Sequence, residues 1–199
     1  MRIGIVGSGA IASALGHRWV RAGHTVRLGG RDRGRAAATA ERIGARPGTP
    51  AEAVADAEAV LLAVPWAAAA EVAALLPAGV TALDPTNPVA HGVGVLELPP
   101  GIAAARSIAA AAPDTHVVKA FHLFPAHTWA GTGPVPVTVA LCGDDPAALR
   151  TAETLVRATG ATPAVLGGLD RARQLEEAAG FVIGLAFAGH DPRAAVPGR

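Results

Sequence analysis

The six residues 7–12, with the sequence Gly-Ser-Gly-Ala-Ile-Ala, constrain the fold more than any other segment of this chain. They match the pattern G-x-G-x-x-[GA]. They follow a short β-branched run at residues 2–6 and open a stretch with apolar residues at helical spacing, residues 10–22. In such a turn the first glycine permits the tight bend, the second lets a pyrophosphate approach the backbone, and the small third residue lets helix and strand pack closely. The free N–H groups at the start of the helix favour an anion. We therefore expect a dinucleotide to bind at Gly7, Ser8, Gly9, Ala10 and Ile11.

Strand and helix patterns alternate along residues 1–120. Further strands are expected at residues 25–28, 59–64, 80–83 and 116–120, and further helices at residues 32–43, 66–75 and 102–111. Strands that alternate with helices form a parallel sheet with right-handed crossovers. The sequence therefore predicts an α/β protein of the Rossmann type, with a doubly wound, mostly parallel sheet and a dinucleotide-binding core at residues 1–120.

The pattern changes after residue 120. A stretch bearing Pro and Gly at residues 124–136 predicts a lid or a loop on the substrate side. A strand at 137–141, a helix from Asp145 and Pro146 to 158, a strand at 162–166 and a long final helix at 169–188 follow. We expect these elements to form a small α/β extension, residues 121–190, of one single domain, and residues 191–199 to be a mobile tail.

Composition narrows the class of protein. Hydrophobic residues make up 51% and charged residues 17% of the 199, which argues against disorder. The net charge of +1 gives no reason to expect a nucleic acid or an anionic membrane as partner. The single cysteine, Cys142, excludes an internal disulfide framework and fits a reducing compartment. The apolar stretch at 178–189 has about twelve residues, against roughly twenty needed to span a bilayer. There is no signal-peptide pattern, so we expect a cytoplasmic protein.

The residues after the second expected strand distinguish NADP from NAD. The chain reads Gly30-Arg31-Asp32-Arg33-Gly34-Arg35, with Arg31 directly after the strand and Arg35 one helical turn later. Arginine suits a 2′-phosphate because its planar guanidinium donates two hydrogen bonds at once. This favours NADP(H). In the alternative, Asp32 binds the ribose hydroxyls of NAD and the arginines form a solvated face.

Together with segments further along, these residues resemble the family of NADPH-dependent coenzyme F420 reductases. The segments that carry the resemblance appear in the family's order over residues 1–188: Gly7-Ser8-Gly9, Gly30-Arg31 with Arg35, Val64-Pro65-Trp66, Asp84-Pro85-Thr86-Asn87-Pro88, Val117-Val118-Lys119-Ala120-Phe121-His122 and Cys142-Gly143-Asp144-Asp145. The resemblance implies an oxidoreductase that transfers a hydride between NADPH and the deazaflavin coenzyme F420, and a homodimer.

The resemblance also implies roles for single residues. Arg31 and Arg35 would hold the 2′-phosphate, and Val64, Pro65 and Asn87 would flank the NADP. Together with Asn87, the residues expected to form the acceptor pocket are His122, Leu123, Phe124 and Pro125. Two departures weaken the match. Gly30 stands where family members often have a hydroxyl residue, and the stretch 124–136, with His127 and Trp129, is less recognisable.

Hydride transfer between two bound rings needs close placement and exclusion of water more than an acid or a base. The two catalytic candidates are Lys119 and His122, at the end of the fifth expected strand. Lys119 is the chain's only lysine, which indicates either a site that needs an ammonium group or a solvated strand end. No histidines have the close spacing typical of a metal site, and none is expected.

Several points stay open at this stage. Trp66, Phe121, Phe124 and Trp129 line a flat-ring pocket or belong to the core. Phe181, Val182, Leu185 and Ala186 recur at helical spacing, which indicates burial against the sheet or a second subunit. Arg106, Arg171 and Arg173 either grip the acceptor's anionic tail or lie at the surface. The acceptor is coenzyme F420, or else a flavin, a ferric chelate, an imine or a carbonyl; a third hypothesis is a non-catalytic NADP(H)-binding sensor.

Overall fold

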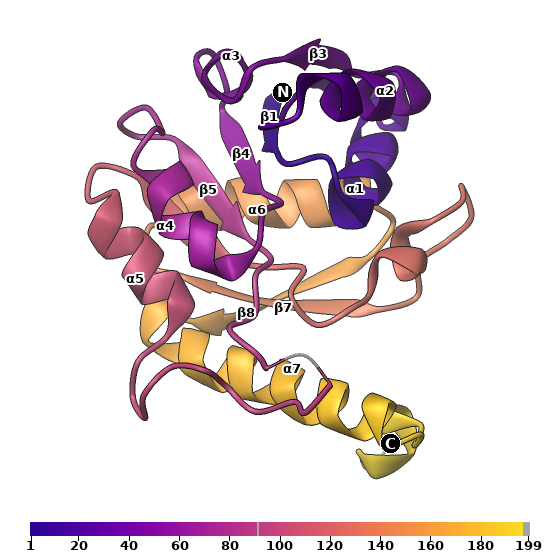
Figure 1. Ribbon diagram of the computed structural model, residues 1–199, viewed down its shortest axis with the longest axis vertical. Helices are drawn as coiled ribbons and strands as arrows, with labels where there is room; N and C mark the ends of the chain where they lie inside the picture. The colour runs from indigo at the N-terminus through magenta and orange to yellow at the C-terminus, as the bar shows by residue number, and fades with distance from the viewer. Residues whose placement is uncertain (91, 197–199) are drawn as a thin grey trace.

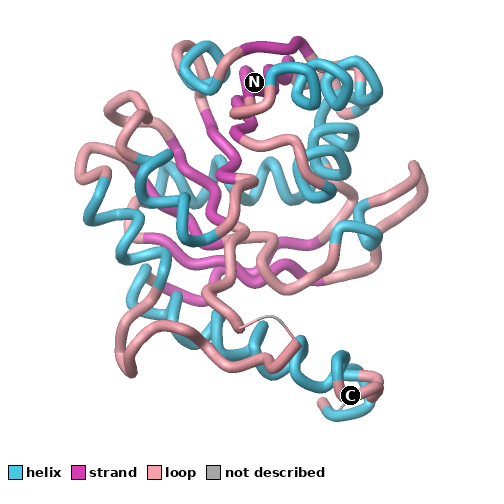
Figure 2. The backbone as a smooth tube through the Cα atoms, viewed as in Figure 1, coloured by secondary structure: helices cyan, strands magenta, loops and turns pink. Residues whose placement is uncertain are grey.

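A computed structural model describes residues 1–90 and 92–196 (Figures 1 and 2). The strands are β1 (Arg2–Val6), β2 (Thr25–Gly29), β3 (Arg46–Gly48), β4 (Ala59–Leu62), β5 (Thr81–Asp84), β6 (His116–Lys119), β7 (Thr138–Gly143) and β8 (Thr162–Gly167). The α-helices are α1 (Ala10–Arg21), α2 (Arg33–Ile43), α3 (Pro50–Val54), α4 (Trp66–Ala73), α5 (Ala104–Ala111), α6 (Pro146–Ala158) and α7 (Ala172–Phe187). Short 3₁₀ helices are η1 (Ala126–Trp129), η2 (Leu169–Arg171) and η3 (Pro192–Ala195).

The described strands form one sheet in the order β3-β2-β1-β4-β5-β6-β7-β8. All neighbouring pairs are parallel except β6 with β7, which run antiparallel. The order runs outward from β1 in both directions, as in a doubly wound sheet. The predicted Rossmann-type fold with a mostly parallel sheet is therefore confirmed.

Helices cover both faces of the sheet, and each face has its own core. Helices α1, α2 and α6 bury residues such as Leu15, Trp19 and Leu155 against one face. Helices α3, α4, α5 and α7 bury residues such as Ile108 and Leu175 against the other. Alternate residues of a strand serve the two cores, as Leu61 and Leu62 of β4 do. Burying one such leucine contributes about 1.5 to 3 kcal/mol, so the two cores stabilise the sheet that carries the loops at its ends.

Two elements were not predicted from the sequence. Strand β3 contains only Arg46, Pro47 and Gly48, and it pairs in parallel with β2 at the edge of the sheet. Helix α3 follows directly. Thr49 caps it by accepting a hydrogen bond from the Glu52 backbone, while the Glu52 side chain accepts one from the Thr49 backbone. This capping box is a sequence signal for a helix start, although the helix itself is too short to show periodicity.

Strands β7 and β8 extend beyond the carboxyl ends of the other strands. Only Cys142 and Gly143 of β7 pair with β6, opposite Lys119 and Val118. Because β7 runs antiparallel, its residues 138–141 continue past the end of β6, and β8 follows β7 in parallel. Part of the segment after residue 120 therefore projects past the carboxyl end of β6.

The carboxyl-terminal part departs from expectation in detail. Helix α7 begins at Ala172 after the 3₁₀ turn η2, rather than at residue 169. Phe181 is 52% exposed and Ala186 is also exposed, so the predicted burial of these two residues against the sheet is wrong; burial against a second subunit stays a prediction. Of the tail, Pro192–Ala195 form η3, and residues 197–199 lie outside the described residues. No helix in the described ranges has the length and apolar character to cross a membrane.

Candidate active site

The turn after β1 has the geometry of an anion site. Gly7 has φ +120°, and its N–H donates to the Gly29 carbonyl at 2.7 Å. A Cβ at Gly7 would lie 2.0 Å from the Ala63 carbonyl oxygen, so only glycine fits there. Gly9 is the residue before α1, no side chain caps the helix, and a Cβ at Gly9 would meet nothing within 4 Å. The first N–H groups of α1 are therefore free for a ligand.

The end of β2 presents two arginines beside this turn. Arg31 and Arg35 are exposed, and within the described ranges neither guanidinium has an ion-pair or hydrogen-bond partner. Asp32 caps α2, since its Oδ1 accepts the Arg35 backbone N–H at 2.9 Å. A carboxylate engaged as a helix cap competes poorly for ribose hydroxyls, so the geometry favours the arginines as nucleotide ligands.

Gly30 leaves a small space between the turn and α2. A Cβ there would lie 3.4 Å from the Ala36 Cβ and 3.6 Å from the Ser8 Oγ, which are ordinary contact distances. A Cβ would therefore fit without a clash, so packing around this position does not require glycine.

The loop after β4 lies at the carboxyl ends of the parallel strands, as the nucleotide turn after β1 does. The strand ends at Leu62, two residues earlier than predicted, which places Val64 and Pro65 in the loop, with Pro65 just before α4. Trp66, the first residue of α4, donates its indole N–H to the Glu97 carboxylate at 2.9 Å. This contact ties α4 to the long loop between β5 and α5.

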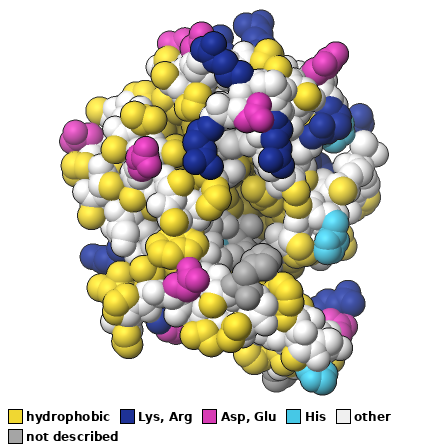
Figure 3. All heavy atoms as spheres, viewed as in Figure 1, with side chains coloured by type: hydrophobic (Ala, Val, Ile, Leu, Met, Phe, Trp, Pro, Cys, Tyr) yellow, Lys and Arg dark blue, Asp and Glu magenta, His cyan; other side chains and the backbone are white. Residues whose placement is uncertain are grey.

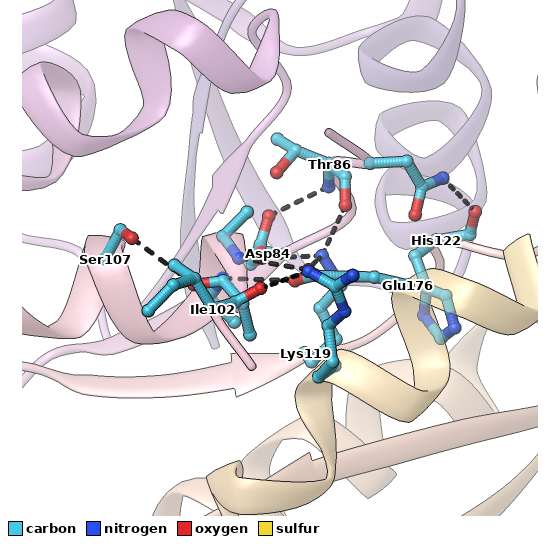
Figure 4. Close-up of polar contacts among 12 residues, drawn as sticks. Asp84, Thr86, Ile102, Ser107, Lys119, His122 and Glu176 are labelled. Atoms are coloured by element: carbon cyan, nitrogen blue, oxygen red, sulfur yellow. Dashed lines mark hydrogen bonds and ion pairs between the residues drawn. The ribbon is translucent and has the colours of Figure 1, made fainter. Parts of the chain in front are cut away.

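Lys119 is buried in a cluster of charges (Figure 4). Its side chain is 0% exposed, and its Nζ lies 2.9 Å from Asp84 Oδ2 and 3.2 Å from Glu176 Oε1; both carboxylates are also 0% exposed. Nζ donates to the Thr86 carbonyl as well. The interpretation of Lys119 as a solvated strand end is therefore wrong. No pattern in the sequence indicated that Glu176 of α7, 57 residues after Lys119 in the chain, is its ion-pair partner.

The cluster joins four elements, the strands β5 and β6 and the helices α5 and α7. Glu176 accepts the first N–H groups of α5, from Ala104 at 3.0 Å and from Ala105 at 3.2 Å. Asp84 Oδ1 accepts the Thr86 N–H at 2.8 Å. These contacts hold the loop after β5 against β6 and α7. Lys119 therefore acts on the site through the loops that it fixes.

Buried polar atoms without partners gather at the ends of β5 and β6. Both ring nitrogens of His122, which is 6% exposed, lack a hydrogen-bond partner among the described residues, as do Asn87 Oδ1 and Thr86 Oγ1. The other end of the Asn87 amide donates to the His122 carbonyl at 2.7 Å, which joins the two loops. Leaving such a group unsatisfied costs about 1 to 3 kcal/mol. This arrangement is typical of a place where a polar ligand or water completes the hydrogen bonds.

His122 is neutral over the physiological range of pH. Burial, and next the charge of Lys119, lower the pKa of its imidazole from the usual 6.5 to about 3. A neutral imidazole offers one hydrogen-bond donor and one acceptor. Together with the Asn87 oxygen, this set suits a ligand group that both donates and accepts, such as an amide or an imide.

The backbone turns sharply just before His122. Phe121 has φ 62°, the only non-glycine residue in the described ranges with positive φ. A bulky residue rarely adopts this conformation. Its ring is held by edge-to-face contacts with Trp19, at 5.9 Å between centroids, and with Trp129, at 5.4 Å.

The candidate aromatic residues differ in their burial. Phe121 and Trp129 are 2% and 0% exposed and belong to the core. Of the residues expected to form the acceptor pocket, Leu123 and Phe124 are half-buried and Pro125 is exposed.

A groove of about 730 Å³ begins at the nucleotide turn and runs between α1, α2 and η1. Ser8, Gly9, Ala10 and Arg35 line its start. Sequence reasoning missed its continuation along the two helices.

The face drawn in Figure 3 is hollowed at its centre, and basic side chains lie along the upper rim. No group of three or more His, Cys, Asp or Glu residues in the described ranges is placed to hold a metal ion.

Comparison with known families adds to this geometry. Residues 2–88 match the family model described as NADP oxidoreductase, coenzyme F420-dependent. The chain is 33% identical over 181 residues to the metalloreductase STEAP3 of Rattus norvegicus. The alignment covers 88% of this chain but only 36% of that relative, so this chain spans about a third of its length.

Solved structures share the fold. A protein from Arthrobacter sp. FB24, provisionally named an F420-dependent NADP-reductase, is 23% identical with a TM-score of 0.78, and the match covers 96% of each chain. A hypothetical protein, SMa0349 of Sinorhizobium meliloti, is 24% identical with a TM-score of 0.76, covering 86% of this chain and 88% of that one. A reductive aminase from Aspergillus terreus, solved with NADPH4, cyclohexanone and allyl amine, is 20% identical with a TM-score of 0.70. That match covers 94% of this chain and 62% of the aminase.

Proposed function

We propose that this chain, whose residues 2–88 match the model of the coenzyme F420-dependent NADP oxidoreductase family, transfers a hydride between NADPH and the deazaflavin coenzyme F420. The observation that carries the proposal is the pairing of an uncapped helix start, after Gly7-Ser8-Gly9, with two arginines that have no ion-pair partner in the described ranges. An NADP-type nucleotide presents anionic groups for both features, the pyrophosphate and the 2′-phosphate.

The residues present fit the nucleotide. The open space at Gly9 admits a pyrophosphate against the backbone, where the first N–H groups of α1 and Ile11 at its start receive it. Arg31 and Arg35 would hold the 2′-phosphate. Val64, Pro65 and Asn87 follow β4 and β5, where ligands of doubly wound sheets bind. These assignments agree with the donors and the space that each position offers.

NADPH supplies the hydride; the protein supplies placement, polarity and exclusion of water. His122 stays neutral and presents a donor and an acceptor, and Asn87 Oδ1 presents an acceptor. With Leu123, Phe124 and Pro125 they would bind the polar edge and the flat face of the acceptor ring. Lys119 is a positioning residue, because its buried Nζ is engaged by Asp84, Glu176 and the Thr86 carbonyl and so fixes the loops that carry Asn87 and His122.

Mixing the protein with NADPH and oxidised coenzyme F420 tests this function. The expected result is rapid loss of the deazaflavin's visible absorbance with NADPH and much slower loss with NADH. When a flavin replaces the deazaflavin, the visible absorbance of the flavin should stay unchanged. Binding of NADPH without any loss of absorbance would contradict the proposed acceptor while leaving the nucleotide site intact.

The 33% identity to a metalloreductase over 88% of the chain supports a second candidate, NADPH-dependent reduction of a ferric chelate. It predicts reduction of Fe³⁺ to Fe²⁺, two ions for each NADPH oxidised, in the absence of any deazaflavin. A non-catalytic sensor would bind NADPH tightly and reduce neither acceptor. A homodimer, which the resemblance to the family implies, and a cytoplasmic location, expected from the sequence pattern, are also part of the proposal.

A further inference from the structure

The groove between α1, α2 and η1 is longer than a dinucleotide site requires. Residues 10, 13, 14 and 17 of α1 and residues 35, 38, 39 and 42 of α2 line it, at the spacing that puts them on one face of each helix. The pyrophosphate and 2′-phosphate positions belong to the first turn of each helix. Seven residues correspond to about 10 Å along a helix. His17 and Arg42 therefore lie about two turns beyond Ala10 and Arg35, and with Ser13 and His127 they define the far half of the groove.

The far half carries uncompensated positive charge. One Arg42 nitrogen contacts Ser13 Oγ and Thr39 Oγ1, both at 3.3 Å, and these partners are neutral. Arg42 has no ion pair in the described ranges, and none of the described residues lining the groove is acidic. His17 is half-buried and His127 is exposed. A groove wall with arginine, imidazole and hydroxyl groups and no carboxylate attracts an anionic group.

The wall opposite α1 is fixed in place. Arg18, which is 8% exposed, donates to the carbonyls of Trp129 at 3.0 Å, Gly133 at 2.7 Å and Ala130 at 3.4 Å. These bonds hold η1 and the following loop against α1. The same loop begins at the acceptor-pocket candidates, residues 122–125. The groove is thus preformed. The nucleotide turn borders it on one side, and the loop that follows residues 122–125 borders it on the other.

We propose that the far half of this groove binds the anionic part of the second substrate, a phosphate or carboxylate group on a flexible tail. This inference rests on the proposed function, because it assigns the substrate's tail after its ring has been assigned to the ends of β5 and β6. Arg173 is not free for this role. Its NH1 donates to the carbonyls of Pro99 and Ile102, at 3.0 and 2.7 Å, and its Nε pairs with Glu177.

Arg42→Ala tests the proposal, with Arg21→Ala as the matched control. Arg21 is an exposed residue of α1 outside the groove lining. Quenching of deazaflavin fluorescence at saturating NADP⁺ gives dissociation constants for coenzyme F420 and for the same deazaflavin without its anionic tail. Arg42→Ala should weaken F420 binding about tenfold and leave the tail-less compound unchanged, and Arg21→Ala should change neither. Equal weakening for both deazaflavins would overturn the proposal. So would a loss confined to NADPH relative to NADH, which would make Arg42 part of the 2′-phosphate site.

A second readout separates this proposal from the function itself. If the native protein binds neither deazaflavin, the proposed function fails, and the groove is tested with inorganic phosphate at saturating NADP⁺. The NMR signals of His17 and His127 should then shift with phosphate in the native protein and in Arg21→Ala, and not in Arg42→Ala. Absence of a shift in the native protein would refute the anion site.

Discussion

Replacing Lys119 by methionine should destabilise the protein severely, because it leaves two buried carboxylates without their cation. At an effective dielectric constant of about 20, contacts of 2.9 and 3.2 Å each correspond to roughly 5 to 6 kcal/mol of attraction. Desolvation of the three charges offsets much of this in the native protein. Removing the ammonium leaves Asp84 and Glu176 desolvated and unpaired, and such a change costs about 3 to 5 kcal/mol. That is a large part of the 5 to 15 kcal/mol typical of a domain.

Urea unfolding at pH 7 measures this loss. The double variant Lys119→Met/Glu176→Gln removes one carboxylate with the cation, so it should recover about 1 to 2 kcal/mol relative to Lys119→Met alone. Arg157→Met is the surface control, since Arg157 pairs with Glu153 at 3.6 Å and is 59% exposed; it should cost at most about 0.5 kcal/mol. A loss below about 1 kcal/mol for Lys119→Met, or no recovery in the double variant, would refute the cluster as the link between β5, β6 and α7.

Three further predictions concern the site. Because His122 has its pKa lowered to about 3, the unfolded chain binds its proton at higher pH than the folded chain. The free energy of unfolding should therefore fall as the pH drops from 6.5 toward 3, and less steeply in His122→Gln; an NMR titration of His122 with a pKa near 6.5 would contradict this. Gly30→Ser should tighten NADPH binding about fivefold, by about 1 kcal/mol, and leave NADH unchanged in calorimetric titrations; equal effects on both would show that the added hydroxyl does not reach the 2′-phosphate. Arg35→Ala should weaken NADPH binding at least about tenfold with NADH unaffected, and an unchanged NADPH affinity would remove Arg35 from the site.

Much of the fold could be predicted because it depends on local patterns. The turn at Gly7–Gly9 and the alternation of strands and helices predict the parallel sheet, and Asp145 with Pro146 marks the start of α6, where Asp145 accepts the Ala148 N–H at 2.7 Å. The short elements β3 and α3 were not predicted, because β3 contains a proline and three residues cannot show an alternating pattern. The edge of the sheet, rather than the sequence of β3, determines that it pairs.

The site was predicted in part. Residues that follow strand ends could be grouped, because parallel strands finish at one edge of a sheet. The partner of Lys119 could not be predicted from the sequence. Glu176 lies on α7, and the position of this helix depends on packing against the second core. The groove along α1 and α2 also depends on tertiary packing, because the loop that closes it is held by Arg18 through backbone carbonyls that carry no sequence signal.

A single-turnover reaction with NADPH carrying deuterium at both C4 positions tests the central claim most directly. Mass spectrometry of the reduced coenzyme F420 should show one deuterium per molecule, transferred without exchange with water. Oxidation of the NADPH with no deuterium in the deazaflavin, or no oxidation at all, would contradict direct hydride transfer between the two rings at this site.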